Sequence, residues 1–286
     1  MIVLESTFPK NYREEEIGKI LNYAQTGKFC QVICVPGAGK ATIMRILAHN
    51  REVIRHHLKE KESAFRFVYI NLQELANFSD AEVLEFLYLS LTDNKPNTKE
   101  PLLLSKEIKE FVNKFTENQN LVLLFDHFDQ YQNQLPRLFF ELLKNLTTIA
   151  KYKFSCVFGT RRDLSELLDI EVLKQYYDFF IGNTVYISIN NEPATNILFA
   201  QIEKVFQKKL NPELKTKIIS LTGGHAKLTK VISEMVLMEN INLNTEELLI
   251  KPLVNATLFE LWLYLTAQEQ QTLKEITSKN TSLDEP

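Results

Sequence analysis

Short apolar runs rich in β-branched residues alternate with longer amphipathic stretches up to residue 189 of this 286-residue chain. The runs are CQVICV (30–35), FRFVYINL (65–72), LVLLFD (121–126), FSCVFGT (154–160) and TVYISI (184–189). Near-continuous hydrophobicity is typical of parallel strands that are covered on both faces. Apolar residues at helical spacing occupy the stretches between them, including 80–91, 103–115 and 135–150. Such alternation predicts a three-layer α/β fold with a five-stranded parallel sheet and right-handed crossovers.

After residue 189 only helical patterns remain. The first opens with Asn residues and Pro193, which are typical of a helix start, and Gly223 and Gly224 separate the next two helices. From Asn255 onward one apolar helix precedes a second helix, for which Thr266 is the expected cap. We therefore predict an α/β domain over 1–190, a helical lid over 191–243, and a C-terminal helical segment over 244–286 that resembles the beginning of a winged helix.

The segment CQVICVPGAGKATI (30–43) joins the first predicted strand to a helix and resembles the phosphate-binding P-loop, G-x-x-x-x-G-K-[ST]. Cys34 stands at the first Gly of the pattern and Ala41 at the hydroxyl position. Glycine allows the unusual backbone and the close phosphate approach that this loop needs, and Lys40 supplies positive charge. The predicted phosphate-binding residues are Pro36, Gly37, Ala38, Gly39, Lys40, Ala41 and Thr42. The alternative is an ordinary strand-to-helix turn that contains a lysine by chance.

Two substitutions bear on hydrolysis. The methyl group of Ala41 cannot coordinate Mg²⁺, which weakens the predicted metal site. The third strand ends in LVLLFDHFDQ, where Asp126 would hold Mg²⁺ through water and His127 stands where an acidic residue commonly polarises the attacking water. A neutral imidazole can accept a proton near pH 7, yet this substitution favours slow or absent hydrolysis. Asp129 either substitutes for the missing carboxylate or caps the following helix.

Together with NYREEEIGKIL (11–21), VFGTRRD (157–163) and TGGHAKL (222–228), these motifs resemble the AAA+ superfamily. The similarity is greatest to its origin-recognition-like ATPases and to the related STAND signalling ATPases, and it extends over residues 5–280. The resemblance implies bound ATP or ADP. It assigns Tyr12, Arg13 and Ile17 to the adenine, Thr160 and Arg161 to the γ-phosphate, and His225 and Lys227 to the sensor of the lid, with Lys in place of Arg.

Each of these residues also has a structural interpretation. Arg161 and Lys227 are alternatively solvated charges, His225 is alternatively the cap of its helix, and Arg13 alternatively belongs to a surface turn. The cysteines Cys30, Cys34 and Cys156 lie in apolar runs without metal-ligand spacing, which favours buried thiols in a reducing compartment. No apolar run approaches the roughly 18 residues that a spanning helix needs, so we expect a cytoplasmic protein with no membrane partner.

The sequence leaves several function classes open. We expect a nucleotide-dependent conformational or assembly switch that acts on self-association or on a protein partner, with an arginine such as Arg137, Arg161 or Arg162 completing a neighbouring site. A weak ATPase activity is left undecided. One alternative is a DNA-handling ATPase, either a replication initiator or a transposition regulator. The net charge of −3 gives no general attraction to nucleic acid. The other alternative is a pseudo-ATPase that serves as an interaction module.

Overall fold

The computed structural model describes residues 4–172, 174, 176, 182–239, 241 and 243–281. The chain divides into two compact units. The first consists of Met1–Cys34 and Gly39–Ser188, and the second of Val35–Ala38 and Ile189–Pro286. The tip of the loop after the first strand therefore groups with the C-terminal helices. The three predicted domains, 1–190, 191–243 and 244–286, stay a prediction.

The first unit contains the predicted sheet. Its five parallel strands are β1 (Cys30–Ile33), β2 (Phe65–Asn71), β3 (Asn120–Asp126), β4 (Phe154–Thr160) and β5 (Thr184–Tyr186). They lie in the order β2-β3-β4-β1-β5, so β1 is flanked by two strands that follow it in the sequence. The register pairs Ile33 with Thr160 and Asn71 with Asp126. Because the strands are parallel, their carboxyl ends meet at one edge of the sheet.

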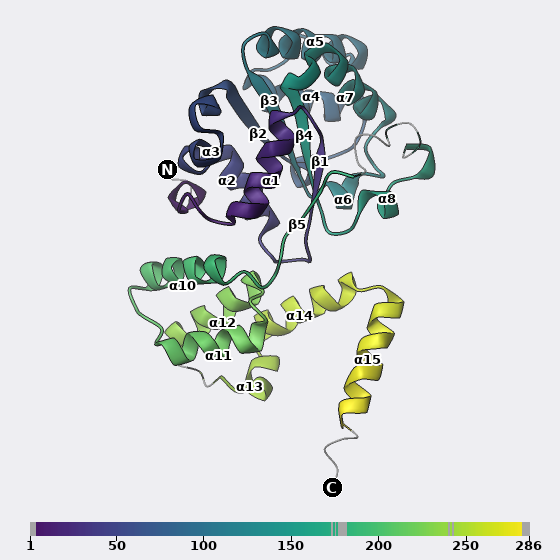
Figure 1. Ribbon diagram of the computed structural model, residues 1–286. Helices are drawn as coiled ribbons and strands as arrows, with labels where there is room; N and C mark the ends of the chain where they lie inside the picture. Colours follow the sequence, from purple (N-terminus) through teal and green to yellow (C-terminus); the bar gives the residue numbers. More distant parts are fainter. Residues whose placement is uncertain are drawn as a thin grey trace. The chain divides into compact units, whose positions relative to one another are not determined.

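Helices cover both faces of this sheet (Figure 1). The helical elements that the structure describes in this unit are η1 (Leu4–Thr7), α1 (Glu14–Gln25), α2 (Lys40–His49), α3 (Arg51–Leu58), η2 (Lys59–Ala64), η3 (Leu72–Glu74), α4 (Asp80–Thr92), α5 (Pro101–Thr116), α6 (Phe128–Tyr131), α7 (Arg137–Ala150), η4 (Lys151–Lys153) and α8 (Leu164–Leu167). On one face α4, α5 and α7 pack together, while α1, α2 and α3 form a separate group on the other face (Figure 1). The prediction of a three-layer α/β fold is confirmed.

Apolar packing holds the ends of β3 and β4 in place. Every residue of β4, and every residue of β3 after Asn120, is buried. The rings of Phe125 and Phe158 are stacked with centroids 5.5 Å apart, and Phe128 lies 4.6 Å from Phe158. Such aromatic contacts add about 0.5–1.5 kcal/mol per pair to the burial of the rings. The polar residues at these two strand ends therefore stand on a rigid base.

The second unit is helical. Its helices are α10 (Glu192–Phe206), α11 (Pro212–Thr222), α12 (Ala226–Glu239), α13 (Thr245–Leu249), α14 (Pro252–Tyr264) and α15 (Ala267–Thr281). Phe199, Ile218 and Ile232 lie in its apolar core. The predicted cap of the last helix is confirmed, because Thr266 Oγ1 accepts from the backbone N–H of Glu269 at 3.2 Å and the Glu269 carboxylate accepts from the backbone N–H of Thr266 at 2.7 Å.

The prediction that the cysteines are buried is also confirmed. Cys30, Cys34 and Cys156 are buried and form no disulfide. Burial raises the pKa of each thiol, which keeps these side chains protonated and unreactive. Within the described residues, no helix combines the length and the hydrophobicity that crossing a membrane requires.

Candidate nucleotide-binding site

The loop between β1 and α2 has the backbone that phosphate binding requires. Gly37 and Gly39 adopt φ angles of 77° and 106°, which disfavour any residue with a Cβ. Gly39 is the residue before α2 and provides no side-chain cap. The first backbone N–H groups of α2 and the positive end of its dipole are therefore available to an anion.

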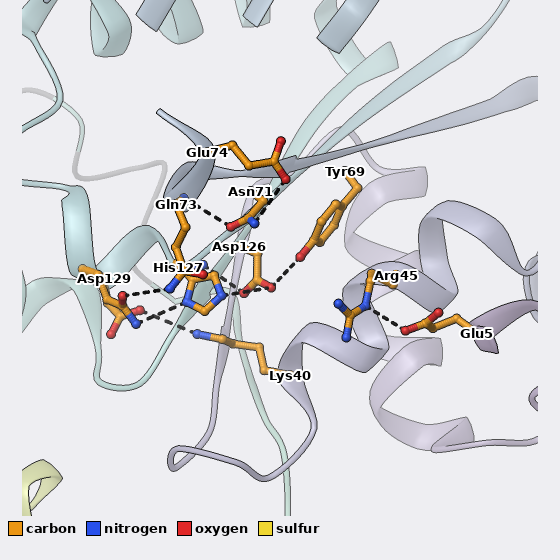
Figure 2. Close-up of polar contacts among 11 residues, drawn as sticks. Glu5, Lys40, Arg45, Tyr69, Asn71, Gln73, Glu74, Asp126, His127 and Asp129 are labelled. Carbon is orange, nitrogen blue, oxygen red and sulfur yellow. Dashed lines mark hydrogen bonds and ion pairs between the residues drawn. The ribbon is translucent and has the colours of Figure 1, made fainter. Parts of the chain in front are cut away.

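Lys40 begins α2 and extends toward the end of β3 (Figure 2). Its side chain is 10% exposed, and Nζ lies 3.6 Å from Oδ1 of Asp129. The other oxygen of Asp129 accepts a hydrogen bond from Nε of Arg161, 2.5 Å away. Asp129 lies inside α6, whose preceding residue is His127, and it does not cap that helix. The carboxylate of Asp129 thus joins the two basic residues that the sequence assigns to phosphate binding.

Asp126 ends β3 and is fully buried. Its Oδ2 accepts a hydrogen bond from the hydroxyl of Tyr69 at 2.8 Å, and its Oδ1 accepts from the backbone N–H of His127 at 2.9 Å (Figure 2). Burial raises the pKa of Tyr69, and the neighbouring carboxylate raises it further. Tyr69 was not predicted from the sequence. Its only signal is a polar ring two residues before the end of a largely apolar strand.

His127 lies directly beyond β3, with a left-handed backbone at φ 59°. Its Nδ1 is 3.2 Å from the amide nitrogen of Gln130, and its Nε2 is 3.8 Å from Oδ2 of Asp126 (Figure 2). An amide nitrogen can only donate, so Nδ1 is the acceptor and the ring hydrogen of the neutral imidazole is on Nε2. In this arrangement no lone pair of the ring is free to accept a proton from water.

Thr160 ends β4 beside Ile33 of β1. It is fully buried, and its hydroxyl has no hydrogen-bond partner. Leaving a buried hydroxyl unpaired costs about 1–3 kcal/mol. An unpaired donor at the carboxyl edge of the sheet is suited to a phosphate oxygen, in agreement with the sensor role assigned to Thr160. That role stays a prediction.

The predicted adenine residues precede and begin α1. Tyr12 is buried, packs edge-on against Phe8 with centroids 4.7 Å apart, and has its hydroxyl 3.9 Å from the position that a Cβ on Gly39 would take. Burial raises the pKa of Tyr12. Arg13 is also buried and donates to Glu16 at 2.9 Å and to the carbonyl oxygen of Ser188 at 3.0 Å. Arg13 is therefore not part of a surface turn, and it ties the start of α1 to the residues after β5.

His225 and Lys227 lie at the start of α12, in the second unit with the loop tip. The backbone N–H of Leu228 donates to Nδ1 of His225 at 3.2 Å, so the expectation that His225 caps its helix is confirmed. Nε2 of His225 then carries the hydrogen and donates to the carbonyl oxygen of Pro36 at 2.7 Å. Burial lowers the pKa of His225 and favours this neutral form.

Lys227 contacts the same loop through its backbone. Its N–H donates to the carbonyl oxygen of Gly37 at 3.1 Å. The ammonium group, about half exposed, instead binds the carboxylate of Glu260 in α14 at 2.7 Å. Glu260 was not predicted from the sequence, because it belongs to no motif. A phosphate that used the Lys227 side chain would have to replace this exposed ion pair.

These residues fit a nucleotide better than a metal ion. The glycine loop, Lys40 and the unpaired Thr160 hydroxyl fit a phosphate chain. Ala41 provides no oxygen to a metal, and each oxygen of Asp126 already accepts a hydrogen bond. Among the residues that the structure describes, no three His, Cys, Asp or Glu side chains form a cluster suited to a metal ion.

No protein-family model matches the sequence, and no curated protein matches it. Solved structures do resemble the fold. The ORC1 protein of Aeropyrum pernix in complex with DNA matches with a TM-score of 0.55 and 15% identity over 89% of this chain. A Walker-type ATPase of Pyrococcus abyssi matches with a TM-score of 0.52 and 15% identity over 98%. Domain III of the replication initiation protein DnaA from Thermotoga maritima matches with a TM-score of 0.51 and 14% identity over 87%.

These similarities confirm a fold of the AAA+ type over most of the chain. The chain spans 66%, just under two thirds, of the ORC1 chain, 81% of the Pyrococcus ATPase and 94% of the DnaA domain. At such low identity the likeness is one of fold alone. The resemblance to STAND ATPases and the roles of the individual site residues stay predictions.

Proposed function

We propose that this protein binds an adenine nucleotide, ATP or ADP, and acts as a nucleotide-dependent conformational or assembly switch with slow or absent hydrolysis. Phosphate binding is supported by Gly37, Gly39, Lys40 and the unpaired hydroxyl of Thr160. Slow or absent hydrolysis is supported by Ala41, which has no side-chain oxygen for a metal ion. The observation that carries the proposal is the hydrogen bond between Nδ1 of His127 and the amide of Gln130, while Nε2 lies 3.8 Å from Oδ2 of Asp126, which is too far for a hydrogen bond.

The switch itself rests on the loop tip. Pro36 and Gly37 belong to the helical unit, and their carbonyl oxygens accept from His225 and from the backbone of Lys227. A nucleotide that rearranges this loop would alter two hydrogen bonds at the start of α12. A ligand shifts such an equilibrium only by its different affinity for the two arrangements, so ATP and ADP must affect these bonds unequally.

Titration calorimetry tests the proposal. Purified protein is titrated with ADP and with ATP, with and without Mg²⁺, beside the Lys40→Ala variant. We expect micromolar affinity, about −8 kcal/mol, with little dependence on Mg²⁺. Binding is expected to be lost in K40A. An absence of heat with every nucleotide would contradict the switch and favour the pseudo-ATPase interaction module instead.

Hydrolysis is measured separately. We expect phosphate release to be slow, because nothing at His127 accepts a proton from water in the observed arrangement. Rapid turnover that His127→Ala abolishes would mean that this histidine is a catalytic base and that the protein is an ATPase.

A DNA-handling role is a second candidate, favoured by the fold shared with an ORC1 protein that was solved with DNA. Binding to DNA that weakens steeply with added salt would support it. Salt-insensitive retention, or none, would count against it.

A further inference from the structure

The strongest feature that the proposed function does not use is the carboxylate of Asp129. Its side chain is 2% exposed, and it lies between the two basic residues of the site. A buried carboxylate is costly unless cations or donors compensate it. Here Lys40 and Arg161 compensate the charge of Asp129. The two cations expected to bind a phosphate are therefore already paired with a carboxylate.

Asp129 holds its two partners unequally. Its Oδ2 forms a direct hydrogen bond with Nε of Arg161. Its Oδ1 forms no hydrogen bond and lies 3.6 Å from Nζ of Lys40, which is a looser ion pair. Lys40 can therefore turn to a new anion at little loss, whereas Arg161 is held beside Asp129 by a charge-assisted hydrogen bond, which is about twice as strong as a neutral one.

Because Asp129 binds Arg161 more firmly than Lys40, the site would distinguish nucleotides by the length of their phosphate chain. A diphosphate can use the loop N–H groups and Lys40 while the pair of Asp129 and Arg161 stays intact. A third phosphate adds about one negative charge overall near pH 7, and as the terminal group it carries up to about two charges itself. If it extends toward Arg161 and Thr160, it approaches a buried carboxylate, and charges interact strongly where water is excluded.

We propose that Asp129 is a specificity-determining residue that makes this site prefer a nucleoside diphosphate over the triphosphate. The inference rests on the proposed nucleotide binding. It identifies the nucleoside diphosphate as the ligand that the switch holds in its resting state. In this arrangement the diphosphate is the default occupant, and the triphosphate binds well only when Asp129 releases Arg161.

The test compares Asp129→Asn with the unaltered protein. Asparagine keeps the shape and an oxygen that can accept from Arg161, but it removes the charge. Affinities for ADP and ATP are measured by calorimetry in the presence of a chelator, so that Mg²⁺ does not mask the phosphate charge. We expect the unaltered protein to bind ADP about tenfold more tightly than ATP, and D129N to bring this ratio to within about twofold, chiefly by strengthening ATP.

Two controls accompany the variant. Asp93→Asn makes the same charge change at a side chain that is 89% exposed at the end of α4, and it is expected to leave the ratio unchanged. Inorganic pyrophosphate and tripolyphosphate replace the nucleotides in a second series. A preference for pyrophosphate that disappears in D129N would locate the discrimination in the phosphate chain.

The outcomes separate the two proposals. An unaltered protein that binds neither nucleotide contradicts nucleotide binding, and the inference with it. An unaltered protein that binds ATP as tightly as ADP, or a D129N variant with an unchanged ratio, overturns the inference alone. Far-ultraviolet circular dichroism checks that D129N is folded. If D129N does not fold, Asp129→Ser gives the same test, because serine also removes the charge and is expected to bring the ratio to within about twofold.

Discussion

The imidazole of His225 donates a hydrogen bond from Nε2 to the carbonyl oxygen of Pro36, with 2.7 Å between the two atoms. The same ring caps α12 through Nδ1. One neutral side chain therefore fixes both the start of a helix and the tip of the candidate phosphate loop. Protonation would remove the acceptor at Nδ1, so this arrangement depends on pH.

Replacing His225 with Asn is expected to reduce the pH dependence of stability. Burial lowers the pKa of His225 below its usual value of 6.5, so the folded protein binds fewer protons than the unfolded chain near and below that pH. The stabilisation is present above pH 6.5 and is lost as the pH falls through the lowered pKa. Thermal unfolding at about pH 7.5 and 5.5 should show a larger loss for the unaltered protein than for H225N, in which Asn still caps the helix. Equal losses would mean that His225 does not titrate in this way.

Replacing Ala41 with Thr is expected to make nucleotide binding depend on Mg²⁺. The new hydroxyl stands at the position from which the P-loop pattern supplies a metal ligand. Calorimetry should show that Mg²⁺ strengthens ATP binding to A41T by about tenfold and has little effect on the unaltered protein. Ala41→Val is the matched control, since valine has the shape of threonine without the oxygen. The same Mg²⁺ effect in A41V would rule out coordination by the hydroxyl.

Alanine should be tolerated less well at Gly37 than at Gly39. Both positions have positive φ, and a left-handed backbone costs a residue with a Cβ about 1–2 kcal/mol. At Gly37 the added Cβ would also lie 2.8 Å from Cε1 of His225 and 2.9 Å from Cβ of Lys227, whereas at Gly39 the nearest atom is 3.9 Å away. Urea unfolding of the two variants measures the difference. A G39A variant that is less stable than G37A would contradict the contacts around the loop tip.

Removing the hydroxyl of Tyr69 should destabilise the first unit. Tyr69→Phe leaves Oδ2 of the buried Asp126 without its donor, at a cost of about 1–3 kcal/mol in the free energy of unfolding. Tyr152→Phe is the control. Tyr152 is 78% exposed, so this substitution should change the free energy of unfolding little. Chemical denaturation of both variants provides the comparison, and equal stabilities would mean that the Tyr69 hydrogen bond contributes nothing net.

Much of the fold could be predicted because its signals are local. The apolar runs at 30–35, 65–72, 121–126, 154–160 and 184–189 each overlap a strand of the sheet, since uninterrupted hydrophobicity suits a strand buried on both faces. The loop between β1 and α2 and the acidic end of β3 could also be predicted from the sequence, because their chemistry depends on residue types at fixed spacing.

The contacts of the site could not be predicted in the same way. Tyr69 reaches Asp126 because β2 pairs with β3, a pairing that no residue of either strand specifies by itself. Asp129 allowed two interpretations, a catalytic carboxylate or a helix cap, and the structure excludes the cap. The position of Arg161 at the end of β4 placed its guanidinium beside that carboxylate.

The sequence by itself determined the strands, the candidate phosphate loop and the residue types at Ala41 and His127, because these follow from periodicity and from the chemistry of single side chains. Only the tertiary structure decided which partners those side chains have. The order β2-β3-β4-β1-β5 brings Lys40, Asp126, Asp129 and Thr160 to one edge of the sheet from distant parts of the chain. Whether a buried charge there is neutralised, hydrogen-bonded or unpaired depends on distances of a few ångströms, which sequence spacing does not encode.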